Sequence, residues 1–122
     1  MKKLWIFVGL SGALAVIAGA MSVHLLADML SVKELARIQT AATYQIYHTI
    51  VLAVLCVYYQ FKSLFIIKLS CVLFTLAIVL FSGSLYLYTA SAYHPLVFLT
   101  PIGGLLFILG WLNLIRLAFV KS

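Results

Sequence analysis

Four long apolar stretches constrain the fold of this chain more than any other feature. They occupy residues 4–27, 41–59, 69–90 and 97–120. Each can cross a hydrocarbon core about 30 Å thick as a helix of ~20 residues. Hydrocarbon offers no water to backbone polar groups, so apolar segments of this length span a membrane as helices. We therefore predict an all-α integral membrane protein with four transmembrane helices in an antiparallel bundle.

Composition leaves little room for anything else. The chain has 122 residues, of which 66% are hydrophobic and only 8% are charged. That is too few polar residues to cover a soluble domain, and the four spans use most of the length. We expect residues 1–122 to form a single membrane domain that is itself the functional unit.

The basic residues indicate a topology. They stand one or two at a time at span ends and form no basic stripe, so the net charge of +6 does not indicate a nucleic-acid partner. Alternate segments place two of them, Lys33 and Arg37, on one side. The other six lie on the opposite side: Lys2, Lys3, Lys62, Lys68, Arg116 and Lys121. The positive-inside rule then predicts that both termini are cytoplasmic.

The N-terminus resembles a secretory signal, with two lysines, an apolar run and Ala18-Gly19-Ala20 as a candidate cleavage site. The apolar run continues past this site through Leu26. We therefore interpret it as a signal anchor that is retained.

The two cysteines, Cys56 and Cys71, fall near the cytoplasmic ends of their spans. We expect buried thiols there and neither a disulfide nor a metal site.

The segment between the first two spans has a polar pattern of its own. Ser31 with Glu34 three residues later is a capping-box pattern, and apolar and polar residues then alternate at helical spacing. We predict a short amphipathic helix at about residues 31–39, lying on the outer membrane surface. A lid over the mouth of the bundle is the alternative.

Small residues predict where helices approach one another. Ser11, Ala15 and Gly19 repeat every four residues in the first span, which favours close packing within the bundle or between protomers. Residues 82–84 predict a second close approach.

The start of the fourth helix has two interpretations. Pro101 either lies in the first turn of a helix that begins near Leu96, or it follows Thr100, which is then the true N-cap after non-helical backbone.

Most of the unusual polar residues fall in the outer half of the spans when depth is counted at about 1.5 Å per residue. The candidate site consists of His24, Tyr44, Gln45, His48, Ser82, Ser84, Tyr86 and Thr100. These groups either hydrogen-bond one another and hold the helices in register, or line a small polar pocket that opens outward. Two histidines could hold a haem or metal, but without a carboxylate or third ligand we expect no metal and no cofactor.

The spans lack the groups that catalysis would use. They contain no carboxylate, and no Cys–His pair shares a depth. We therefore expect no enzymatic activity. A proton-coupled transporter usually needs an acidic residue within the membrane, which this chain does not have.

Several of these pieces together resemble a known family. They are residues 9–26, 40–48, 80–88 and 100–111, within a match that runs from about residue 9 to residue 114. Phe81–Tyr86 and Thr100–Gly104 are specific in combination. The chain resembles the small bacterial membrane proteins of the domain of unknown function 423 family, which are YgdD-like. Around His24 the family pattern is similar to GAFGAHGL; this chain keeps the histidine but departs at residues 21–23 and 25.

The resemblance implies a four-span bacterial membrane protein and supplies no activity, substrate or cofactor. We expect a small inner-membrane protein that is a non-enzymatic accessory or scaffold component acting through helix contacts. Its partners would be the lipid bilayer and either further copies of itself or another membrane protein. The alternative is an outward-facing site for a small solute, or a minimal permease, lined by the polar residues listed above.

Overall fold

The structure, a computed structural model, describes residues 1–121 and is helical throughout apart from short connections. Its elements are α1 (Lys2–His24), α2 (Val32–Phe61), α3 (Phe65–Ser91), the 3-10 helix η1 (His94–Phe98), α4 (Leu99–Leu114) and the 3-10 helix η2 (Ile115–Phe119). Four helical segments are long and apolar enough to cross a membrane, the fourth being His94–Phe119 taken as one. The four transmembrane helices predicted from the sequence are confirmed.

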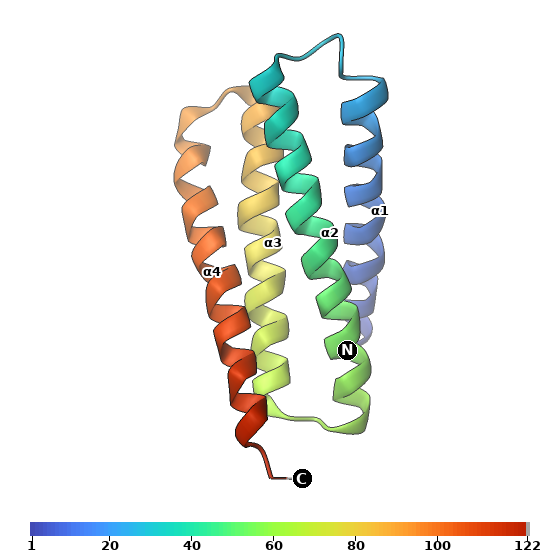
Figure 1. The fold of residues 1–122 in the computed structure, drawn as a ribbon, viewed down its shortest axis with the longest axis vertical. Coiled ribbons are helices and arrows are strands. Elements are labelled where there is room, and N and C mark those ends of the chain that lie inside the picture. The colour runs from blue at the N-terminus through green and yellow to red at the C-terminus, as the bar shows by residue number, and fades with distance from the viewer. Residues whose placement is uncertain (122) are drawn as a thin grey trace.

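The helices stand side by side in chain order and alternate in direction (Figure 1). Close backbone approaches join α1 to α2, α2 to α3 and α3 to α4. No comparable approach joins α1 to α4 within the part of the chain that the structure describes. The predicted bundle is therefore not confirmed as such, because α1 and α4 form two separate edges. Both termini lie at one end, and the α1–α2 connection lies at the other (Figure 1).

The separate interfacial helix predicted at residues 31–39 is not confirmed. Its capping box is present: the Glu34 N–H donates to Ser31 Oγ at 3.2 Å, and the Ser31 N–H donates to Glu34 Oε1 at 3.1 Å. The helix that this box begins continues without a break to Phe61. Nothing between Gln39 and Ala41 interrupts helical hydrogen bonding, so these residues form the first turns of α2.

The fourth span begins as a 3-10 helix with Pro95 in its first positions, and it becomes α-helical at Leu99. Residues 97–99 therefore have helical backbone, and Pro101 lies in the first turn of α4. Proline is tolerated there because the first N–H groups of a helix have no partner within the helix. The alternative with Thr100 as N-cap after non-helical backbone is wrong.

The apolar core lies between α2, α3 and α4. It contains Leu52, Ile67, Phe74 and Phe107, all nearly or wholly inaccessible to solvent. Both cysteines are buried, as predicted, and both are free thiols. The aromatic ring of Phe74 lies against Gly110, where a Cβ atom would come within 2.6 Å of the ring.

The close approach of α3 and α4 depends on a glycine in α4. A Cβ atom on Gly103 would lie 2.5 Å from the backbone nitrogen of Phe81, so only glycine fits there. At residues 82–84, where the sequence predicts a close approach, Ser82 and Ser84 are buried and bond to neighbouring helices, whereas a Cβ on Gly83 would meet nothing within 4 Å. In the small-residue stripe of α1, Ser11 and Ala15 are buried and Ser11 bonds to α2, so these two residues pack within the chain. A Cβ on Gly19 would meet nothing within 4 Å, so this third residue of the stripe makes no close approach.

Candidate functional site

Gln45 is the centre of the largest polar network. Its amide nitrogen donates to the backbone oxygen of Ser11 at 3.1 Å and to Ser11 Oγ at 3.2 Å. Its amide oxygen accepts from the Tyr86 hydroxyl at 2.7 Å. Thr49 completes the network, bonding to Ser11 Oγ at 2.8 Å and donating to the Gln45 backbone oxygen at 2.6 Å. One side chain thus connects α1, α2 and α3.

Three of the other predicted residues make separate bonds between helices. Ser82 Oγ donates to the backbone oxygen of Ala41 at 2.7 Å, which joins α3 to α2. Ser84 Oγ and Thr100 Oγ1 lie 2.5 Å apart and join α3 to α4. Ser82 and Ser84 are buried, and their hydroxyls have protein partners. These groups pair across helices instead of lining one common pocket.

His48 is buried and has both ring nitrogens engaged. The Trp111 indole N–H donates to His48 Nε2 at 3.1 Å, so Nε2 is the unprotonated acceptor. Nδ1 then carries the hydrogen and donates to the Tyr44 backbone oxygen at 2.7 Å. The imidazole also stacks on Phe107 with ring centroids 3.8 Å apart. A metal or haem iron would have to displace one of these bonds.

The side chains of the remaining two predicted residues, Tyr44 and His24, make no hydrogen bond recorded in the structure, although the Tyr44 backbone accepts from His48. The Tyr44 ring is partly exposed and stacks on Phe81 with centroids 4.8 Å apart. His24 is exposed at the last residue of α1. The described residues contain no group of three or more His, Cys, Asp or Glu that could hold a metal ion.

Sequence reasoning missed a network at the end of the molecule where the termini lie. Asn113 Nδ2 donates to the Ile66 backbone oxygen and to Ser70 Oγ, both at 2.8 Å. Arg116 Nη1 donates to Asn113 Oδ1 at 2.9 Å. A sequence feature that could have predicted this network is the single asparagine in an apolar helix, three residues before an arginine. Nothing in the sequence marked Ser70 of α3 as its partner.

A groove of about 780 Å³ runs beside His48 between α2 and α4. Its walls are largely aromatic and aliphatic and include Tyr47, Phe107 and Trp111. The side-chain polar atoms of Gln45, His48, Ser82, Ser84, Tyr86 and Thr100 have protein partners, whereas Tyr44 and Tyr47 line the groove with no hydrogen bond recorded for their hydroxyls. The chemistry of the site is therefore that of interhelical hydrogen bonding.

Comparisons with known proteins identify relatives of this chain. A family model described as protein of unknown function (DUF423) matches residues 18–104. A UPF0382 membrane protein of Haemophilus influenzae is 38% identical over 113 residues, covering 93% of this chain and 90% of the relative. The UPF0382 inner membrane protein YgdD of Escherichia coli K12 is 38% identical over 106 residues, covering 87% and 81%. This chain belongs to the DUF423 family.

The DUF423 assignment confirms the resemblance seen in the sequence and the membrane character of the chain. A third relative, a UPF0382 membrane protein of Staphylococcus epidermidis, is 40% identical over 114 residues, covering 93% of each chain. No solved structure gave a significant match to this DUF423 chain. The names of these relatives state a membrane location and no activity.

Proposed function

We propose that this DUF423 protein is a non-enzymatic accessory or scaffold component of the bacterial inner membrane. It has both termini in the cytoplasm and acts through lateral contacts of its edge helices. The partner is a second copy of the chain or another membrane protein. The observation that carries the proposal is that α1 and α4 make no close backbone approach to each other within the described residues, so each forms a separate edge of the molecule.

The two edges present continuous apolar faces. Leu10, Leu14 and Ile17 follow one another at helical spacing on α1, and each is more than half exposed. Residues 105, 108 and 112 do the same on α4. Helices in a membrane associate through close van der Waals contact, and two such faces at opposite edges suit lateral assembly.

The alternative of a solute site or minimal permease has less support. Gln45, Tyr86 and Thr100 would have to offer free polar atoms to a solute, and their bonds are already made within the protein. Catalysis has less support still, since the acidic side chains Asp28 and Glu34 both lie in or beside the α1–α2 connection. We therefore propose contact, not transport or chemistry, as the function.

Thiol crosslinking in native membranes tests lateral association. With Cys56 and Cys71 replaced by alanine, Leu14→Cys and Ile108→Cys place one thiol on each edge, and Val79→Cys on α3 is the matched exposed control. We expect an edge thiol to give a defined crosslinked species well above the yield of the control. Edge thiols that crosslink no more than Val79→Cys, together with a lone monomer after mild detergent extraction, would contradict the proposal.

A further inference from the structure

His48 accepts the only hydrogen bond recorded between α2 and α4 among the described residues. The bond runs from the Trp111 indole N–H to His48 Nε2 at 3.1 Å. Other interhelical bonds join α1 to α2, α2 to α3, and α3 to α4. The backbones of α2 and α4 make no close approach comparable to those between consecutive helices. On the α2 side, α4 is therefore held by side chains, and His48 supplies the one hydrogen bond.

This bond requires a neutral imidazole. Nδ1 already donates its hydrogen to the Tyr44 backbone oxygen at 2.7 Å, so Nε2 accepts from Trp111 only while it carries no proton. A second proton on the ring makes both nitrogens donors. Two N–H groups would then face each other, and the bond between α2 and α4 would be lost. Histidine is the side chain whose charge ordinarily changes between about pH 5 and 8.

The surroundings of the ring offer no opposite charge. Phe107 of α4 stacks on it with centroids 3.8 Å apart, and Phe74 of α3 lies against it at 5.5 Å. Neither α3 nor α4 contributes a titratable side chain to these contacts or to the lining of the α2–α4 groove. From α2, the titratable groups in the lining besides His48 are the phenols of Tyr44 and Tyr47. A buried imidazolium without a carboxylate is costly, so protonation favours an arrangement that water can reach.

The α2–α4 groove supplies a route to the ring. His48 is only 7% exposed, but it lines this groove. The α4 residues of the lining run from Pro101 to Trp111, roughly 15 Å along the helix at 1.5 Å per residue. The groove thus extends from the ring toward the end of the molecule that holds the α1–α2 connection (Figure 1). Movement of α4 away from α2 would widen it and expose His48.

We propose that the His48–Trp111 contact is a pH-sensitive latch between α2 and α4. At neutral pH the latch is closed. Acidification protonates His48, breaks the bond from Trp111 and lets the two helices part along the groove, while α4 keeps its contact with α3 at Gly103. The latch acts within one chain and does not depend on the lateral contacts proposed above.

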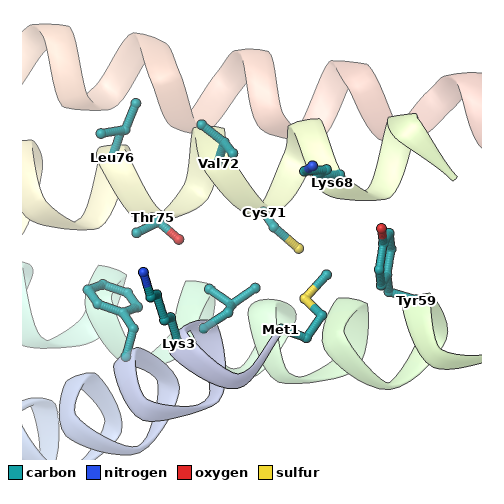
Figure 2. Close-up of a pocket in the computed structure, with 10 residues that line it drawn as sticks. Met1, Lys3, Tyr59, Lys68, Cys71, Val72, Thr75 and Leu76 are labelled. Atoms are coloured by element: carbon teal, nitrogen blue, oxygen red, sulfur yellow. The ribbon is translucent and has the colours of Figure 1, made fainter. Parts of the chain in front are cut away.

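A second groove, between α1 and α3, provides an internal control. It has a volume of about 610 Å³ and lies at the end that holds both termini, where Lys3, Lys68 and Thr75 contribute to its lining (Figure 2). The Thr75 hydroxyl is buried and has no partner among the described residues. No histidine lines this groove. The spacing of α1 and α3 should therefore not respond to pH in the range where histidine changes charge.

Nitrogen-15 NMR of the full chain in lipid nanodiscs, with labelled histidine, follows the charge of His48. The chain has three histidines, so His24→Gln with His94→Gln leaves His48 as the one reporter. We expect a neutral ring protonated at Nδ1 at about pH 7.5 and an imidazolium at about pH 5. A ring that stays neutral at the lower pH, or one that carries its hydrogen on Nε2 at the higher pH, would overturn the proposal.

Distances between pairs of spin labels report whether the helices part. Both cysteines are first replaced by alanine. Exposed positions then carry the labels: Ile50→Cys with Leu112→Cys for α2 and α4, and Leu14→Cys with Val79→Cys for α1 and α3. On acidification we expect the α2–α4 distance to lengthen by about 2 Å, the size of a typical helix shift, and the α1–α3 distance to stay the same. An unchanged α2–α4 distance contradicts the latch, and so does an equal change in both pairs, which indicates general loosening.

Two variants separate the latch from other effects of acid. His48→Gln keeps an acceptor oxygen for the Trp111 indole but does not titrate, so its α2–α4 distance should be the same at both pH values. Trp111→Phe keeps an aromatic ring without the donor, so its α2–α4 distance should already be long at neutral pH. Helical circular dichroism as in wild type checks that both variants fold. A His48→Gln variant that responds to acid as strongly as wild type, or a Trp111→Phe variant with wild-type distances, would rule the latch out.

Discussion

At the residue scale, Gln45 shows how one amide can hold three membrane helices together. Its donor end is used by Ser11 of α1 and its acceptor end by Tyr86 of α3, so both ends of the side chain are satisfied. The hydroxyl of Tyr86 uses Gln45 as its acceptor in turn. Each such bond contributes modestly in a membrane, about 0.6 kcal/mol, because the unfolded chain also finds partners there.

Replacing Gln45 with alanine should therefore lower stability. We expect a loss on the order of 1 kcal/mol from the bonds to Ser11 and Tyr86. Denaturant unfolding of the purified protein in detergent, followed by circular dichroism, measures it. Gln39→Ala is the control, because Gln39 is an exposed glutamine on the same helix. Equal stability of the two variants would show that the network contributes nothing.

At the element scale, the pairing of α3 with α4 depends on the absence of a side chain. Gly103 brings α4 against the backbone of Phe81, and the Ser84–Thr100 bond lies beside this contact. The sequence marked residues 100–104 as unusual and could not say which helix they faced. It predicted a close approach at residues 82–84 of α3, but the glycine that meets the neighbouring backbone is Gly103 of α4.

Gly103→Ala should accordingly separate α3 from α4. The added methyl group collides with backbone, which cannot rotate away, and overpacking of this kind costs about 1–3 kcal/mol. Gly83→Ala should be neutral or slightly stabilising, since its Cβ meets nothing and alanine favours helix over glycine. Thermal unfolding in detergent compares the two. A Gly83→Ala variant as unstable as Gly103→Ala would contradict the α3–α4 geometry.

At the scale of the whole molecule, the helices form a row with two edges and an asymmetric charge distribution. Six basic residues belong to the end that holds the termini, and the other two, with both acidic side chains, belong to the opposite end. This asymmetry supports a cytoplasmic position for both termini.

Reporter fusions test the orientation. A fluorescent protein that matures only in the cytoplasm should be bright at either terminus. A periplasm-active phosphatase inserted into the α1–α2 connection, between residues 28 and 30, should be active. A dark fusion at either terminus, or an inactive but expressed phosphatase insertion, would contradict the orientation that the positive-inside rule predicts.

The sequence by itself determined the number of transmembrane helices, the capping box at Ser31 and the burial of both cysteines. These depend on local properties: the length of an apolar run, the spacing of two side chains, the cost of a polar group in lipid. The partners of the polar residues were decided only by the tertiary structure. Trp111 bonds to His48, and Asn113 bonds to Ser70, because helix rotation and register bring them together.

Which helices pack against one another was likewise known only from the tertiary structure. Hydropathy requires each helix to be apolar but is the same whether a helix faces lipid or protein, so it could not distinguish a closed bundle from a row. The polar exceptions in the four apolar stretches were found from the sequence. That they bond mainly to one another, and leave a separate groove with an unpaired threonine between α1 and α3, follows from the positions of the helices.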